Sequence, residues 1–184
     1  MNKSSKFISL SGWSGISIGV LALIASYIAF AIQKSTFHTC PLINHHFVEK
    51  LVYLGIGTLV ISLILGFIFT YNKSKRLGQK IWTEQTKTLL WNLFIPLAVG
   101  GVLCLILLQQ SRYGSVSSYT LIFYGLALIN ASKYTLSEIR SLGIINCILG
   151  LIGAYFMGYG LLLWALGFGV FHIIYGILMM KKNK

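Results

Sequence analysis

The sequence contains no aspartate, and its only acidic residues are three glutamates. Charged residues make up 10% of its 184 positions, whereas soluble globular domains carry about 25%. So few solvating side chains exclude a water-soluble enzyme and a disordered tail. Three cysteines, a small and odd number, exclude a disulfide-stapled secreted domain. What the chain does have is a hydrophobic content of 56% and a mean hydropathy of +0.79. These values predict an integral membrane protein.

Long apolar runs indicate the fold class. A helix that crosses the ~30 Å hydrocarbon core of a bilayer needs roughly 20 mostly apolar residues. The fourth run and the fifth are separated by a capping box, in which Thr135 and Glu138 satisfy backbone N–H groups of a new helix. We predict one all-α domain over 1–184, a bundle of six membrane-spanning helices at about 7–32, 51–71, 89–110, 118–134, 136–157 and 160–180. Five spans are the alternative if the short fourth run is re-entrant.

Basic residues are divided unevenly between the two ends of these helices. With the N-terminus in the cytoplasm, only Lys34, Lys50 and Arg112 of the fifteen lysines and arginines fall outside. Because basic residues resist translocation, this bias predicts that both termini are cytoplasmic. The dispersed positive charge indicates contact with anionic membrane lipid and no nucleic-acid interface. The run at 7–32 is longer than the roughly 7–15 apolar residues of a signal peptide, so we interpret it as a helix.

Small residues recur at helical spacing in the first, fifth and sixth predicted helices. Membrane helices associate largely through close backbone approach, which small side chains permit. The glycines on these stripes include Gly12, Gly15, Gly19, Gly150, Gly169 and Gly176. We expect them to pack helices together inside the bundle. A dimer face is the alternative that the pattern leaves open.

Polar residues within the predicted spans gather in the cytoplasmic half. They are Asn92, Asn130, Ser132, Asn146, His172 and Tyr175. One interpretation is a polar pocket that opens inward, with His172 as its one titratable member. The other is a set of interhelical hydrogen bonds, each contributing roughly 0.6–2 kcal/mol. Pro96 follows Asn92 by one turn and removes a backbone hydrogen bond from the third helix.

The sequence contains no recognisable constellation for catalysis. The three glutamates fall in loops or at helix ends, which argues against a two-carboxylate hydrolase site and a carboxylate proton pathway in mid-membrane. Nucleophile-elbow, zinc-protease and phosphate-binding motifs are missing, so we expect no catalytic residues and no cofactor. The outer connection at 33–50 contains His45, His46 and Glu49, whose i, i+3 and i, i+4 spacing suits a metal ion. An exposed polar connection is the simpler interpretation.

The C-terminal run LGIINCILGLIGAYFMGYGLLLWALGFGVFHIIYGILMM resembles the short, glycine-punctuated repeats of small six-helix bacterial inner-membrane proteins, including the acid-resistance membrane protein family. The whole chain, with LSGWSG at 10–15 and LIFYGLALINASKY at 121–134, is similar to an uncharacterised bacterial membrane protein family of similar size. The resemblance implies six helices and a location in the bacterial inner (cytoplasmic) membrane. It supplies no catalytic residue to carry over.

These patterns together predict a non-enzymatic protein of the inner membrane. We expect an accessory or scaffold subunit that packs against a larger membrane complex, with membrane lipid and a protein partner or a second copy as its contacts. The alternative is a small transporter or channel that uses the polar residues of the cytoplasmic half. An inverted repeat of broken helices would favour transport, and only the third predicted helix contains such a break.

Overall fold

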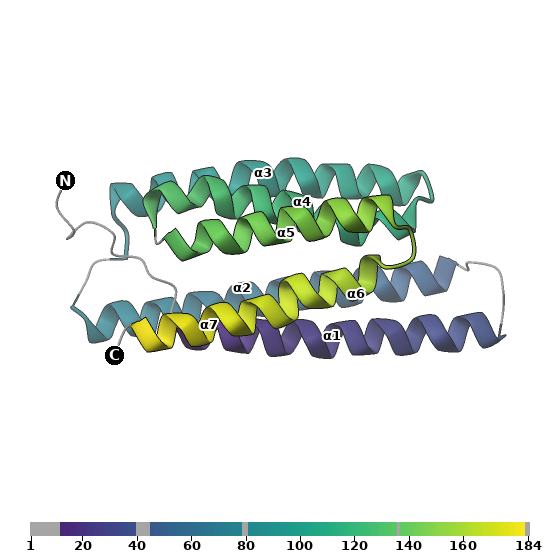
Figure 1. Cartoon of the computed structure of the whole chain (residues 1–184), viewed down its shortest axis with the longest axis horizontal. Helices are drawn as coiled ribbons and strands as arrows, with labels where there is room; N and C mark the ends of the chain where they lie inside the picture. The colour runs from purple at the N-terminus through teal and green to yellow at the C-terminus, as the bar shows by residue number, and fades with distance from the viewer. Residues whose placement is uncertain (1–11, 40–44, 79–80, 136, 183–184) are drawn as a thin grey trace.

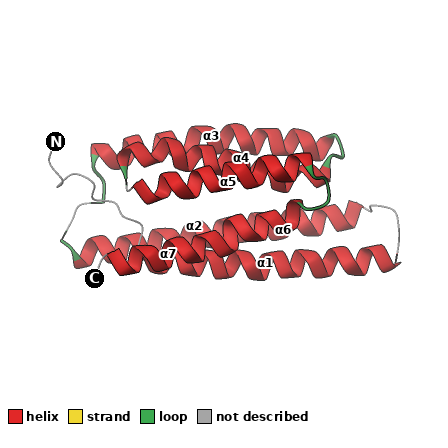
Figure 2. Cartoon of the chain, viewed as in Figure 1, coloured by secondary structure: helices red, strands yellow, loops and turns green. Residues whose placement is uncertain are grey.

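The computed structural model describes residues 12–39, 45–78, 81–135 and 137–182, and the regular elements in these ranges are all helices (Figure 2). In chain order the helices are α1 (Gly12–Thr39), α2 (His45–Arg76), α3 (Glu84–Gln109), α4 (Tyr113–Ala131) with the 3-10 turn η2 (Ser132–Tyr134), α5 (Ser137–Tyr155), α6 (Gly160–Trp164), η3 (Ala165–Val170) and α7 (Phe171–Lys182). The segment η3 is a π-helical stretch that joins α6 directly to α7. The three segments therefore form one continuous helix, here called the last helix. The all-α prediction is confirmed.

Five of these helices are long and apolar enough to cross a membrane. The sixth long helix is α4, whose first turns are less apolar because they carry Ser115, Ser117 and Ser118. It lies between α3 and α5 and also contacts α6, so neighbouring helices cover much of its surface. The chain is therefore a polytopic membrane helix bundle, while the crossing of the membrane by α4 stays a prediction.

The helices are arranged in two groups of three, which Figure 1 shows one above the other. In the first group α4 contacts α3 and α5, and in the second α1 contacts α2 and the last helix. The two groups meet where α4 and α5 face α6, η3 and α7. We call this interface between α4, α5 and the last helix the seam.

Glycines bring α1 and the last helix into close contact. A Cβ atom added to Gly176 would lie 2.6 Å from the carbonyl oxygen of Gly12, and one added to Gly19 would lie 2.7 Å from that of Gly169. A Cβ atom on Gly15 would lie 3.0 Å from the Cα atom of Gly176. Because even a methyl group would collide with backbone here, only glycine permits this separation of the two helices.

The α4–α5 contact is built in the same way. A Cβ atom on Gly143 would lie 2.7 Å from the carbonyl oxygen of Gly125, and one on Gly150 would lie 2.8 Å from that of Ser118. The six glycines named from the sequence stripes all lie between helices of the same chain in this structure.

Helix ends near the predicted connection at 33–50 differ from the predicted boundaries. The helix α1 continues to Thr39 and α2 begins at His45, so much of the predicted 33–50 connection is helical. The reason is that hydropathy marks the lipid-buried length, whereas a helix of 32 residues such as α2 is about 48 Å long and projects beyond the ~30 Å core. Residues 7–11 of the first predicted span lie outside the described residues.

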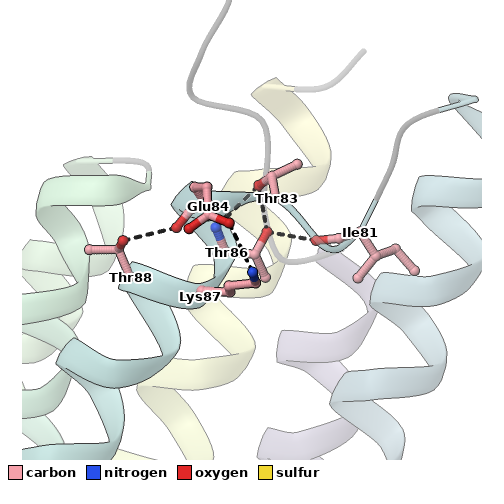
Figure 3. A network of polar contacts seen from close by, with 6 residues as sticks. All are labelled: Ile81, Thr83, Glu84, Thr86, Lys87 and Thr88. Atoms are coloured by element: carbon pink, nitrogen blue, oxygen red, sulfur yellow. Dashed lines mark hydrogen bonds and ion pairs between the residues drawn. The ribbon is translucent and has the colours of Figure 1, made fainter.

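The start of α3 is set by side-chain hydrogen bonds (Figure 3). The Thr83 hydroxyl accepts from the N–H of Thr86 at 3.2 Å, and the buried Thr86 hydroxyl donates to the Ile81 carbonyl at 2.6 Å. Glu84 in the first turn pairs with Lys87 at 2.8 Å. The two threonine hydrogen bonds satisfy backbone groups at the helix terminus, so α3 begins ahead of the predicted start at 89.

Candidate functional site

The structure divides five of the six predicted polar residues between two places. Asn92 and Asn130 meet where α3 contacts α4, and Asn146, His172 and Tyr175 lie on the seam. Ser132 makes a local hydrogen bond, in which its hydroxyl donates to the Ile129 carbonyl at 2.6 Å. Five of the six polar residues are therefore distributed over two interhelical contacts, and Ser132 belongs to neither.

The Asn92–Asn130 contact repairs a break in the backbone of α3. Pro96 has no N–H group, so the Asn92 carbonyl four residues earlier has no donor within its own helix. The Asn130 side chain of α4 donates to this carbonyl at 3.0 Å. The Asn92 side chain donates to the Thr88 carbonyl at 2.8 Å. In this contact the polar side chains act as interhelical hydrogen bonds.

His172 is hydrogen-bonded through both ring nitrogens. Its Nδ1 atom lies 2.9 Å from the carbonyl oxygen of Gly167, and its Nε2 atom lies 2.8 Å from the hydroxyl of Tyr124 in α4. Because a carbonyl oxygen only accepts, Nδ1 carries a proton and donates it. In the neutral imidazole Nε2 then accepts from Tyr124. His172 thus ties the last helix to α4 across the seam.

The π-helical stretch explains why Gly167 needs a side-chain donor. The N–H of Phe171 bonds to the carbonyl of Leu166, five residues earlier, and α7 then returns to the usual spacing of four. This change of spacing passes over the carbonyl of Gly167. The imidazole of His172 supplies the donor, so the irregular backbone and the histidine form one unit.

Aromatic rings surround His172 on the seam. The Phe168 ring centroid lies 4.9 Å from that of Trp164, 4.8 Å from that of Tyr124 and 5.9 Å from that of His172. The sequence prediction did not include Tyr124, Trp164 or Phe168 among the site residues. The i, i+4 spacing of 164, 168 and 172 is the signal that would have found two of them.

Three buried side-chain oxygens on the seam have no hydrogen-bond partner among the described residues. They are the hydroxyl of Ser118, Oδ1 of Asn146 and the hydroxyl of Tyr175. Ser118 and Asn146 are fully buried, and Tyr175 is 6% exposed. Leaving such a group unpaired costs roughly 1–3 kcal/mol. The seam therefore contains polar atoms that protein packing alone does not satisfy.

One end of the seam is charged. Glu138 at the start of α5 forms an ion pair with Lys182 at the end of α7. Basic residues gather at this end of the bundle, where α2 and α7 finish and α3 and α5 begin (Figure 1): Lys73, Lys75, Arg76, Lys87, Lys133, Arg140, Lys181 and Lys182. Lys34, Lys50 and Arg112 lie toward the opposite ends of their helices.

The predicted metal ligands lie at the start of α2. Nδ1 of His46 is 3.5 Å from Oε2 of Glu49, and both side chains are exposed. The side chain of His45 lies outside the described part of the chain. Within that part, no group of three or more histidine, cysteine or acidic side chains is close enough to hold a metal ion.

Comparisons of the chain with protein-family models, with curated proteins and with solved structures find no match. The resemblance to small six-helix bacterial membrane proteins therefore stays a prediction from the sequence. The functional argument depends on the geometry of the bundle itself.

Proposed function

We propose that the protein is a non-enzymatic accessory or scaffold subunit of the bacterial inner membrane, and that α2 is the helix that docks onto a larger complex. The exposure of α2 carries this proposal. Thr58 is the only buried residue among the described side chains of this helix, and α1 is the one helix with which it makes extensive contact. Most of the surface of α2 is therefore available to a neighbouring helix or to lipid.

Two glycines of α2 support docking by a helix. A Cβ atom added to Gly55 or Gly57 would meet no other atom within 4 Å, so neither glycine is needed for packing inside this chain. Small residues on a lipid-facing helix allow the backbone of another helix to approach closely. The glycines of α1 differ from these two, because they pack against the last helix.

The proposed orientation places the basic end of the bundle in the cytoplasm, with six membrane-spanning helices and both termini inside. The gathering of basic residues at that end supports it, because such residues resist translocation. Each basic residue near the surface also contributes ~1 kcal/mol of attraction to anionic lipid headgroups.

The test is native mass spectrometry of the protein extracted gently from its own membrane. We expect a second polypeptide at fixed stoichiometry, and we expect Gly55→Leu to release it. Gly101→Leu on α3 is the matched control, because a Cβ atom at Gly101 likewise meets nothing within 4 Å. Docking through α2 would be contradicted if the extracted protein carried only lipid. It would also be contradicted if the Gly55→Leu and Gly101→Leu variants retained the second polypeptide equally.

A small transporter or channel is the second candidate function. The observation that favours it is the set of unpartnered buried oxygens on the seam. In contrast, the contact between α1 and the last helix is formed by closely packed glycines.

A further inference from the structure

One line of uncovered residues runs along α2 to its basic end. Gly57, Ile61, Ile64, Ile68 and Lys75 follow one another at spacings of four, three, four and seven positions, which places them on one face of a helix. The three isoleucines and the lysine are exposed, and a Cβ atom built on Gly57 would meet no other atom within 4 Å. We call these five residues the Gly57 face.

The glycine of this face has no packing role within the chain. Glycine inside a helix is less favourable than alanine, because it loses more conformational freedom on folding. At Gly15 and Gly176 close contact between helices offsets this loss, whereas at Gly57 no part of the chain comes near. A small residue in an apolar face allows the backbone of another membrane helix to approach closely, and lipid chains do not need one. The Gly57 face therefore favours a helix as its occupant.

The Gly57 face ends in a positive charge that the chain itself does not balance. Lys75 lies in the last turn of α2, together with two further basic residues. The chain has only three carboxylate side chains, and each already contacts another residue: Glu49 contacts His46, Glu84 contacts Lys87, and Glu138 contacts Lys182. An occupant whose charge complements Lys75 therefore has to bring its own carboxylate.

A second copy of the chain does not supply this carboxylate. Copies inserted in one membrane share an orientation, so a two-fold dimer through the Gly57 face would bring identical residues together. Lys75 would then face Lys75, and the one acidic residue of α2, Glu49, lies near the opposite end of the helix. Like charges on neighbouring positions are destabilising. The charge of the Gly57 face thus favours a different polypeptide.

We propose that the Gly57 face receives a membrane-spanning helix of a different polypeptide, which carries a small residue opposite Gly57 and an aspartate or glutamate opposite Lys75. This inference rests on docking through α2 and names the chemistry of the partner. The rise along α2 from Gly57 to Lys75 is about 27 Å. The small residue and the carboxylate of the partner are therefore separated by about 18 positions of its own helix.

The first experiment uses designed membrane helices as probes for the intact protein in phosphatidylcholine vesicles, which contain no anionic lipid. Each probe carries a glycine, either glutamate or glutamine about 18 positions away, and a dansyl group that accepts energy from the tryptophans of the protein. We expect the glutamate probe to bind at least threefold more tightly than the glutamine probe, and Lys75→Gln to abolish the difference. Lys133→Gln is the matched control, because Lys133 is an exposed lysine at the same end of the bundle but outside α2. Equal binding of both probes to the wild type would overturn the acidic partner.

The second experiment, native mass spectrometry of the extracted protein, separates this inference from docking itself. Gly55 lies about 160° around the helix from Gly57, so Gly55→Leu and Gly57→Leu test different faces of α2. We expect Gly57→Leu and Lys75→Gln to release the second polypeptide and Lys133→Gln to retain it.

The outcomes distinguish the two proposals. Release by Gly55→Leu but not by Gly57→Leu or Lys75→Gln would leave docking through α2 intact and overturn the role of the Gly57 face. A second copy of this chain as the released polypeptide would also leave docking intact and overturn the different partner. Lipid as the only bound species would contradict docking and this inference together.

Discussion

The last helix presents two unlike surfaces to the rest of the molecule. Toward α1 it offers Gly169 and Gly176, which allow backbone to lie against backbone. Toward α4 and α5 it offers His172 and Tyr175, together with the ring of Phe168. Close packing of small residues is enough to hold two membrane helices together. On the second surface buried polar groups carry part of the contact instead, through the hydrogen bonds of His172.

The largest effect is expected from breaking the glycine surface. In Gly176→Leu the new side chain would meet the Gly12 carbonyl and the Ile16 backbone, which cannot move aside as a flexible side chain would. We expect a loss of about 3 kcal/mol in unfolding free energy, at the upper end of overpacking effects. Unfolding in mixed detergent micelles measures this loss. Gly101→Leu, which enters open space, should stay within about 0.5 kcal/mol of wild type; similar losses in both variants would refute the comparison.

A smaller effect is expected from the polar surface. His172→Ala removes the partners of the Gly167 carbonyl and the Tyr124 hydroxyl together. Leaving two buried groups unpaired should cost about 2 kcal/mol, at the lower end of the range of roughly 1–3 kcal/mol for each group. The same unfolding assay measures it.

A double-mutant cycle with Tyr124→Phe isolates the bond across the seam. The coupling energy should be about 0.5–1.5 kcal/mol, the net contribution of one hydrogen bond. Additive losses would show that His172 stabilises the π-helical stretch alone and does not tie α4 to the last helix.

The helices were predictable because lipid imposes a strong constraint on the sequence. Apolar runs indicated every long helix, and the predicted boundary between the fourth and the fifth helix agrees with the end of η2 at Tyr134 and the start of α5 at Ser137. The predicted ends were less accurate at the predicted 33–50 connection and at the start of α3, which begins at Glu84 and not at 89. At these two places the helices extend past the hydrocarbon core, so their sequence there is no longer apolar and hydropathy does not predict that it is helical. Capping residues such as Thr83 set the helix boundary instead.

The candidate site was only partly predictable. Asn146, His172 and Tyr175 stand out as polar residues inside apolar runs, but their separation from Asn92 and Asn130 depends on how the two helix groups meet. Tyr124 was missed because its partner is 48 positions away in sequence. The π-helical stretch at 165–170 contains Gly167, whose carbonyl bonds to His172, and the local sequence ALGFGV does not predict this stretch.

The smallest effect is expected at the charged end of the seam. The Lys182 side chain is 58% exposed and that of Glu138 is 27% exposed, so water weakens their attraction. Lys182→Gln should lower the unfolding free energy by about 0–1 kcal/mol, the usual range for exposed ion pairs, and the loss should shrink further in high salt. Lys87→Gln, which breaks the pair with Glu84 inside α3, is the control for an ion pair that joins no two helices. A salt-independent loss above about 2 kcal/mol for Lys182→Gln alone would mean that the charged end, and not the hydrogen bonds of His172, holds the seam closed.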